Sequence, residues 1–271
     1  MNDTRLPAPS LPEVALPEVA LAELDAAVVV LEGTSLPVRL ASLVGGTVEA
    51  LKRRLPRGAQ SMIDGAVRRA LVVALRTALR SGPERNPTRL SGEWLHRGLL
   101  AASGAAGGAL GLPGTLMELP VSTTLLLRQV AAIAAEEGED LSDPLVQAEC
   151  LKVFALGGRN PEDDETESGY FALRLALAEA VKSAVGRGVA QFLPGFLGAI
   201  AARFGVPVAF KLSAQAAPVV GAAGGVAVNL AFLEHFRGVA RAHFTVRRLE
   251  RRHGPAMVRA AYERLRERPI G

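Results

Sequence analysis

The chain has 271 residues, of which 49% are hydrophobic but only 4% aromatic, so its apolar mass is mainly alanine, leucine and valine. That length suffices for one large domain or two small ones, and these residue types favour helices over sheets. The single cysteine, Cys150, excludes an intrachain disulfide and a cysteine metal cluster. The net charge of +4 is unevenly spread: basic segments at 47–83 and 237–268 flank an acidic segment at 136–167.

The first residues are rich in proline and contain a duplication, Leu-Pro-Glu-Val-Ala at 11–15 and again at 16–20. Proline at this spacing blocks a helix. We therefore expect a flexible tail over 1–20 and a single helical domain over 21–271. Because no uninterrupted apolar region follows the first basic residue, the N-terminus does not resemble a signal peptide, which favours a cytoplasmic location.

The first half of the domain is predicted to contain a short helix at 21–31 and two basic amphipathic helices at 36–55 and 59–81. A stretch of small residues follows at 93–112, and Pro113-Gly114 is expected to break it.

The next helix is expected from 120 to 137. Ser142 or Asp143 is the predicted N-cap of the following helix, which Gly157-Gly158 should end.

A helix is also predicted over 163–186, followed by apolar segments at 188–204 and 206–233. A last long helix reaches about Arg252, and Gly254-Pro255 separates it from a short basic helix. No segment alternates like a strand. The expected fold is all-α, a compact bundle with two central apolar helices rich in glycine and alanine and no substantial β-sheet.

Two stretches, 98–117 and 212–233, lack charge and approach the length needed to span a bilayer. Both contain Gly-Ala-Ala-Gly-Gly, which supplies the candidate packing glycines Gly104, Gly108, Gly111, Gly221, Gly224 and Gly225. Such faces let backbones approach closely, so we expect them to pack on each other or on a common neighbour. Burial in the bundle is favoured over membrane insertion, since both stretches contain proline and few large apolar residues.

Strings along the chain, in this order, resemble the EcsC protein family: Ala-Ser-Gly-Ala-Ala-Gly-Gly (102–108), Gly-Leu-Pro-Gly (111–114), Glu-Leu-Pro-Val-Ser-Thr-Thr (118–124), Val-Phe-Ala-Leu-Gly-Gly-Arg (153–159), Glu-Ser-Gly-Tyr-Phe-Ala (167–172) and Ala-Ala-Arg-Phe-Gly-Val (201–206). The resemblance covers about 60–254. It implies a bacterial protein with a membrane-linked role beside an ABC transporter, and it supplies no catalytic residue and no cofactor.

The candidate polar site combines the acids Asp163, Asp164 and Glu167 with His235 and His243. Hard oxygen ligands suit a divalent cation, but the acids lack the spacing of a calcium loop, so no metal is expected. The simpler interpretations are a solvated helix N-terminus for the acids and buried, hydrogen-bonded side chains for the histidines.

The long C-terminal helix carries four arginines on one face, namely Arg237, Arg241, Arg248 and Arg252. A basic amphipathic helix is typical of binding to a membrane surface. The alternative is a solvated face whose arginines pair with the acidic middle of the chain.

We therefore expect a non-enzymatic accessory protein, peripheral at the inner face of the membrane, whose partners are anionic lipid and a transporter or other membrane protein. Integral insertion of 98–117 and 212–233 is the alternative location. The alternative function is a lipid-directed enzyme that uses an acid from 162–167 and a histidine. Nucleic-acid binding is disfavoured by the acidic middle and the scarcity of aromatic residues.

Overall fold

The computed structural model describes residues 16–33, 36–43, 45–48, 50, 53, 59–80, 111–158, 169–185, 189–215 and 221–268. Over these ranges the chain forms helices and turns and no strand, which confirms the all-α fold. The principal helices are α1 (Glu18–Leu31), α2 (Leu36–Leu43), α4 (Ala59–Arg80), α6 (Gly111–Glu136), α7 (Pro144–Leu156), α8 (Tyr170–Val185), α9 (Val189–Gln215), α10 (Gly221–His253) and α11 (Pro255–Arg266).

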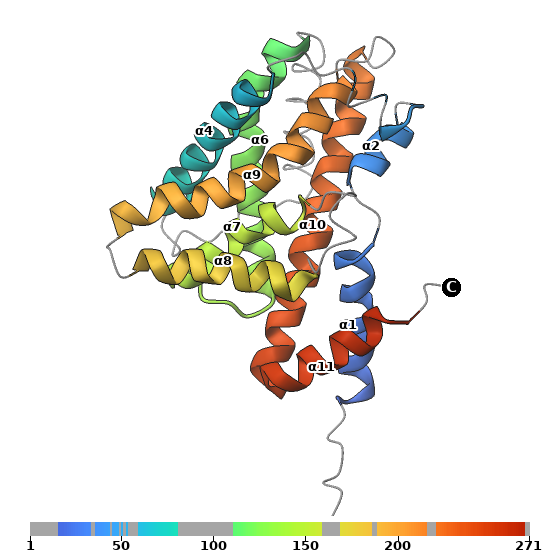
Figure 1. The fold of residues 1–271 in the computed structure, drawn as a ribbon, viewed down its shortest axis with the longest axis vertical. Coiled ribbons are helices and arrows are strands. Elements are labelled where there is room, and N and C mark those ends of the chain that lie inside the picture. Colours follow the sequence, from blue (N-terminus) through green and yellow to red (C-terminus); the bar gives the residue numbers. More distant parts are fainter. Residues whose placement is uncertain are drawn as a thin grey trace, which may run out of the picture.

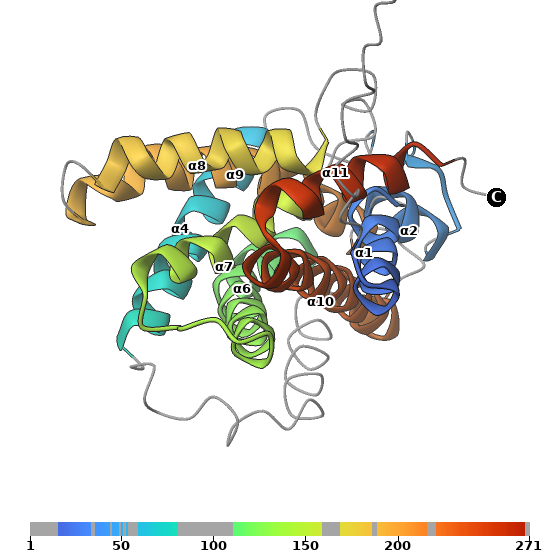
Figure 2. The same cartoon turned by 90° about the horizontal axis from the view of Figure 1, so that it is seen from below.

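The two long helices α6 and α10 pass side by side through the middle of the molecule (Figures 1 and 2). Helix α4 packs on α6 and α9 on one side, and α8 packs on α9. Helices α1 and α11 pack on α10 on the opposite side from α4 (Figures 1 and 2). Consequently α1 and α4 each present one face to the centre and one face outward, in opposite directions.

Aromatic rings join three of these helices at the centre of the core. Phe154 on α7 lies 4.8 Å from Phe204 on α9 and 5.7 Å from Phe236 on α10, measured between ring centroids. Phe232, one turn before Phe236, lies 4.9 Å from it. All four rings are buried. Edge-to-face and tilted pairs add about 0.5–1.5 kcal/mol each to the free energy gained from burial.

Several predicted helix ends are confirmed. The side chain of Asp143 accepts a hydrogen bond of 2.8 Å from the amide of Leu145, so Asp143 is the N-cap of α7. Gly157 is the C-cap of the same helix. Gly254 has a φ of 89°, which only glycine adopts readily, and separates α10 from α11.

The helix predicted over 36–55 is wrong in length, because α2 ends at Leu43. Gly45 adopts a φ of 63°, and the amide of Gly46 donates a 2.9 Å hydrogen bond to the carbonyl of Ala41. This is the left-handed glycine ending of a helix.

The break predicted at Pro113-Gly114 and the helix start predicted at Pro120 are also wrong. Helix α6 begins at Gly111 and continues through both prolines to Glu136. Pro113 falls in the first turn, where a helix needs no backbone donor. Pro120 lies in the interior and removes one backbone hydrogen bond there, and the packing of α6 on α4 and α10 outweighs this cost.

Three other boundaries differ from the prediction. Helix α8 starts at Tyr170 rather than at 163, and α9 continues through 205–207 to Gln215, so the apolar stretch 212–233 belongs to two helices. Phe204 and Val208, which flank 205–207, are both buried. Their packing outweighs the weak helix propensity of Gly205 and Pro207. Residues 18–20 of the expected tail already belong to α1, whereas 1–15 lie outside the described residues.

Candidate functional site

A chain of hydrogen bonds runs through the core between α8, α10 and α7. The hydroxyl of Tyr170, the first residue of α8, lies 2.8 Å from Nδ1 of His243 on α10. Nε2 of the same imidazole lies 3.1 Å from Oε2 of Glu149 on α7. His243 is 0% exposed and Tyr170 5% exposed. Three helices are therefore joined by one polar chain through otherwise apolar packing.

Glu149 is the charged end of this chain. Burial raises its pKa, but the hydrogen bond from His243 and the charges of Lys152 and Arg247 outweigh burial, so the pKa lies well below its ordinary value. Nζ of Lys152 lies 2.8 Å from Oε1 of Glu149, and Nη1 of Arg247 lies 3.4 Å from the same oxygen. The side chain is therefore a carboxylate that only accepts hydrogen bonds.

The protonation of His243 follows from this arrangement. Burial lowers its pKa, and the hydrogen bond that it donates to Glu149 only partly offsets that effect, so the imidazole is neutral. An accepting carboxylate requires the hydrogen on Nε2, which leaves Nδ1 to accept from the hydroxyl of Tyr170. The order of groups matches that of a proton relay, but the imidazole has no exposed surface. In this conformation the chain orients and joins helices, and no substrate can reach His243.

His235 lies in a separate environment. Its Nε2 is 2.9 Å from the carbonyl oxygen of Gly157, at the end of α7. Burial lowers the pKa of His235 to about 4, the hydrogen bond to Gly157 opposes that shift, and the nearby charge of Arg39 adds to it. His235 and His243 thus have different partners and do not form one site. The expectation of a buried, hydrogen-bonded side chain is confirmed for His243, whereas His235 is hydrogen-bonded but only half-buried.

The other predicted site residues are only partly placed. Asp163, Asp164 and Glu167 lie outside the described residues, so their approach to either histidine stays a prediction. Cys150 is buried beside Glu149 on α7, and burial raises the pKa of its thiol to about 12. The thiol is therefore protonated and unreactive, and Cys150 serves as a core packing residue. Among the described residues no three histidine, cysteine, aspartate or glutamate side chains are grouped to hold a metal ion.

Among the predicted packing glycines, Gly104 and Gly108 also lie outside the described residues. Gly111 starts α6, Gly221 and Gly224 lie in the first turn of α10, and Gly225 is buried. Helices α6 and α10 pack against each other, as expected if the glycine faces approach. The contact between the two glycine faces themselves stays a prediction.

The four arginines of α10 that were predicted to bind a membrane surface fall into two classes. Nε of Arg248 lies 2.6 Å from Glu137, and its Nη1 lies 3.3 Å from Glu23 of α1. Arg237 lies 3.3 Å from Glu234. Arg241 and Arg252, by contrast, are exposed. Arg248 therefore pairs with the acidic middle of the chain, and of the four arginines only Arg241 and Arg252 are exposed.

Neighbouring arginines extend this pairing. Arg247 binds Glu139 through two nitrogens, at 2.8 and 3.1 Å, and Arg251 pairs with the same carboxylate. The charge of Arg247, opposed by burial, keeps the pKa of Glu139 below its ordinary value. The ion pairs hold the turn after α6 against the last turns of α10.

A second buried polar cluster lies where α6, α9 and α10 meet. Nζ of Lys211 is 3.0 Å from Oε2 of Glu118, and the amide of Asn229 donates to Oε1 of Glu118 at 3.3 Å. Lys211 is 0% exposed and Asn229 2% exposed. A buried ion pair contributes little net stability but strongly favours the arrangement in which both charges are satisfied.

The sequence interpretation named His243 but missed its partners Tyr170 and Glu149, and it missed the Glu118, Lys211 and Asn229 cluster altogether. Lys211 stands alone between Phe210 and Leu212, and Glu118 stands between Met117 and Leu119. A lone charge within an apolar helix is the signal that could have found them, because such a side chain needs a partner from another element.

Helix α9 contains the segment Gly195–Ala214, which is long and apolar enough to cross a membrane, with a mean hydropathy of 1.4. It is the one such segment found among the described residues, and 67% of it is buried inside the protein. The core helix of a soluble protein meets the same criteria. The segment differs from the stretches predicted at 98–117 and 212–233.

Comparison with known proteins identifies the family of this chain. No curated protein and no solved structure shows significant similarity to the chain. The family model of the EcsC protein family matches residues 93–249, which is more than half of the chain. This match covers both buried clusters, from Glu118 through His243. The chain therefore belongs to the EcsC protein family.

Proposed function

We propose that the protein is a non-enzymatic accessory protein that binds the surface of an anionic membrane and assists a transport or secretion system there. The observation that carries the membrane part is the outward face of α4. The link to transport is drawn from the sequence resemblance, with membership of the EcsC family as its support.

Helix α4 is amphipathic with an unusual outer face. Its inner side is buried, through Ile63, Val67, Ala70, Leu71 and Ala74. On the opposite side Met62 is 56% exposed and Val73 is 38% exposed. Arg69, also exposed, lies on the same face, since spacings of seven and four residues return to one side of a helix. Apolar side chains next to a base are typical of a helix that lies in a membrane interface.

Two more exposed apolar side chains lie on the neighbouring helix. Met117 and Val121 on α6 are 81% and 55% exposed and stand one turn apart. Helix α6 packs on α4, and both helices begin at the same end of the molecule (Figure 1). Clustered exposed apolar residues on a soluble domain mark a binding surface more often than chance.

Peripheral binding fits the structure better than insertion. Within the part of the chain that the structure describes, the one apolar segment long enough to span, in α9, is mostly buried inside the protein. Moreover, it contains Lys211, whose ion pair with Glu118 would have to enter the bilayer or separate. The outer face of α4 can reach lipid without any rearrangement of the core.

Sedimentation with lipid vesicles tests the proposal. We expect binding to vesicles that contain phosphatidylglycerol, weaker binding to phosphatidylcholine alone, and a decrease with salt. Arg69→Glu should weaken binding roughly fivefold or more, since one arginine near an anionic surface is worth about 1 kcal/mol. Met62→Glu should weaken it as well.

The matched control is Leu175→Glu, because Leu175 on α8 is 60% exposed but lies on another helix. It should bind as the wild type does. Arg241→Glu and Arg252→Glu test α10 in the same assay. Absence of binding to anionic vesicles at low salt would disprove the membrane proposal. Equal losses in Met62→Glu and Leu175→Glu would disprove the role of α4.

A further inference from the structure

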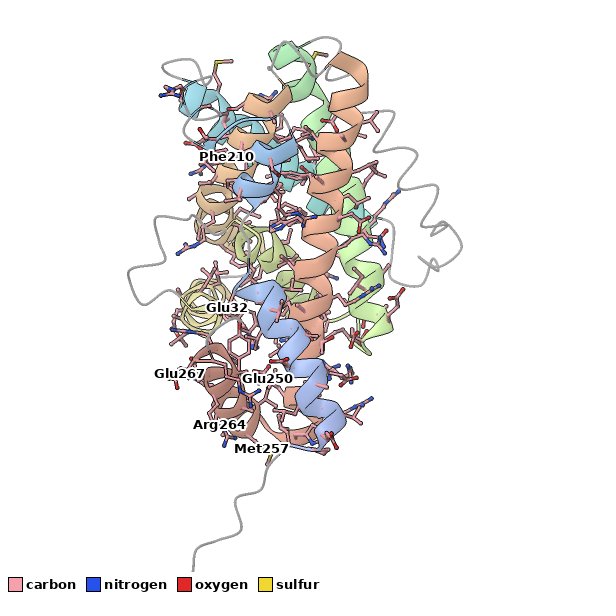
Figure 3. All side chains as sticks on the ribbon, turned by 90° about the vertical axis from the view of Figure 1, so that its right-hand side faces the viewer. Glu32, Phe210, Glu250, Met257, Arg264 and Glu267 are labelled. Atoms are coloured by element: carbon pink, nitrogen blue, oxygen red, sulfur yellow. The ribbon has the colours of Figure 1, made fainter. Side chains whose placement is uncertain are left out.

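Helix α1 lies in a seat on the side of the protein that faces away from α4. The seat consists of the parts of α10 and α11 that α1 contacts (Figures 2 and 3). Val30 of α1 lies against Gly238 of α10, where a Cβ atom would be 3.6 Å from Cγ1 of Val30. Nearer the start of α1, Glu23 lies 3.3 Å from Arg248. Residue numbers fall along α1 as they rise along α10, so the two helices run antiparallel.

The α10 side of the seat is basic. One face of this helix, about 80° wide, carries Gly238, Arg241, Thr245, Arg248 and Arg252. Thr245 is buried, whereas Arg241 and Arg252 are exposed. A helix that lies on this face therefore meets a line of three arginines, which favours a helix that carries acids.

Helix α1 has the complementary charge. Between Leu16 and Glu32 the chain contains acids and no lysine or arginine. Glu23 pairs with Arg248 of α10. At the other end of α1, Glu32 (labelled in Figure 3) accepts a 2.7 Å hydrogen bond from the hydroxyl of Tyr262 on α11. Carboxylates that belong to or follow α1 thus bond to both helices of the seat.

The contact that holds α1 in the seat is small and partly exposed. The side chain of Glu23 is 39% exposed, so water screens its attraction to Arg248. The apolar part of the contact contains two alanines, which bury little area. Its buried side chains are Ala20, Leu24, Ala27 and Val28.

Departure of α1 would not leave Arg248 without a counter-charge. Nε of Arg248 lies 2.6 Å from Glu137, which belongs to the turn after α6 and stays in place. The seat also belongs largely to the family core, because the match over 93–249 includes most of α10, whereas α1 lies outside it. Helix α1 is therefore an addition that covers one face of that core.

We propose that the seat is a docking site for an acidic amphipathic helix of a partner protein, and that α1 fills it as an exchangeable substitute. The partner's helix displaces α1 and supplies the same features, namely carboxylates toward α10 and small apolar side chains between them. A seat between two helices fits a third helix. A membrane bound to the outer face of α4 would lie on the opposite side of the molecule, so this inference goes beyond the membrane proposal and does not depend on it.

Binding of a fluorescent peptide with the sequence of residues 16–33 tests the exchange. In the full chain, Leu24→Asp should drive the tethered α1 out of the seat, because Leu24 is 0% exposed. The peptide should bind this variant at least about tenfold more tightly than the wild type, in which the tethered helix competes at an effective concentration of about millimolar. Equal affinity for the two proteins overturns the proposal.

Two matched controls accompany this experiment. Val29→Asp places the same charge on the solvent side of α1, where Val29 is 62% exposed, and this protein should bind the peptide as weakly as the wild type does. A peptide with Glu23→Lys should bind the Leu24→Asp protein at least about fivefold more weakly, since its lysine faces Arg248. Equal binding of the two peptides would overturn recognition of an acidic helix.

A disulfide lock tests the detachment of α1 without a substitution in the core. The double variant Val30→Cys with Gly238→Cys brings two cysteines within bonding reach, and Cys150 is buried. In the reduced protein the amides of α1 should exchange hydrogen at least about tenfold faster than the buried amides of α10, through local opening. Oxidation should slow the exchange of α1. If α1 exchanges as slowly as α10 in the reduced protein, the proposal is wrong even where Leu24→Asp does not fold.

Vesicles distinguish the helix of a partner from a lipid surface. The reduced and oxidised forms of the lock should bind phosphatidylglycerol vesicles equally. Tighter binding by the reduced form would assign the seat to a membrane and overturn the partner helix. The vesicle experiment with Met62→Glu concerns α4 alone, so the failure of either proposal can be told from the failure of the other.

Discussion

The hydroxyl of Tyr170 lies 2.8 Å from Nδ1 of His243, although 73 residues separate the two in the sequence. The bond joins the first residue of α8 to the middle of α10, and Glu149 continues it to α7. All three positions fall within residues 93–249, which match the family. The chain of bonds fixes how these helices meet, because its polar atoms are paired only in this arrangement.

Tyr170→Phe should lower the free energy of unfolding by about 1–3 kcal/mol, because Nδ1 of His243 loses its donor and stays buried. Urea unfolding at neutral pH measures the change. Removing the exposed apolar side chain Leu175 on the same helix, as Leu175→Ala, should have a much smaller effect. Equal denaturation midpoints for Tyr170→Phe and the wild type would show that the hydroxyl does not support the core.

His235 should make the fold sensitive to mild acid. Its pKa is lowered to about 4 in the folded protein, so the unfolded chain binds a proton more readily as the pH falls below about 6.5. The contribution of neutral His235 is therefore complete above that pH and is lost as the pH falls toward 4. Between about pH 7.5 and pH 5 the loss is about 2 kcal/mol.

Replacement of His235 by glutamine should remove this part of the pH dependence. The lowered pKa of His243 acts in the same direction, so some dependence remains in the variant. The measurement is the difference in unfolding free energy between the two pH values, for wild type and variant. If both lose the same amount of stability, the assigned role of His235 is wrong.

The pair Glu118 and Lys211 allows a double-mutant cycle. Glu118→Gln leaves the ammonium group of Lys211 buried without its counter-charge, which should cost about 3–5 kcal/mol. In the double variant Glu118→Gln with Lys211→Met both charges are absent, and most of that loss should be recovered. Additive losses in the cycle would mean that the two side chains do not interact.

The helix ends that the sequence predicted correctly depend on local chemistry. Asp143-Pro144 provides an N-cap and a first-turn proline, and Gly254-Pro255 provides a break that no neighbouring element alters. Gly45-Gly46 carried a comparable signal, but amphipathic periodicity across it led to a helix that was too long. Where one or two neighbouring residues determine the backbone conformation, the sequence is sufficient to predict the helix end.

The features that the sequence did not predict depend on contacts between residues that are distant in the chain. Pro120 and Pro207 stay inside helices because packing of α6 and α9 outweighs the local cost. Likewise, Glu149 and His243 are 94 residues apart, and nothing local distinguishes Glu149 from a solvated acid. The histidines could be predicted as buried, hydrogen-bonded side chains, whereas their partners required the tertiary structure.

Gly158 shows such a dependence at a single backbone position. A Cβ atom there would overlap the backbone carbonyl of Arg203 on α9, and a backbone atom cannot move aside as a flexible side chain can. Gly158→Ala should therefore force the end of α7 away from α9 and lower the free energy of unfolding by about 1–3 kcal/mol.

Gly195→Ala is the control, because a Cβ at this exposed position of α9 meets no atom within 4 Å. It should leave the protein unchanged or stabilise it by up to about 1 kcal/mol, since alanine favours a helix over glycine. Thermal unfolding of the two variants separates these effects, and a Gly158→Ala protein as stable as Gly195→Ala would show that the two helices do not approach so closely.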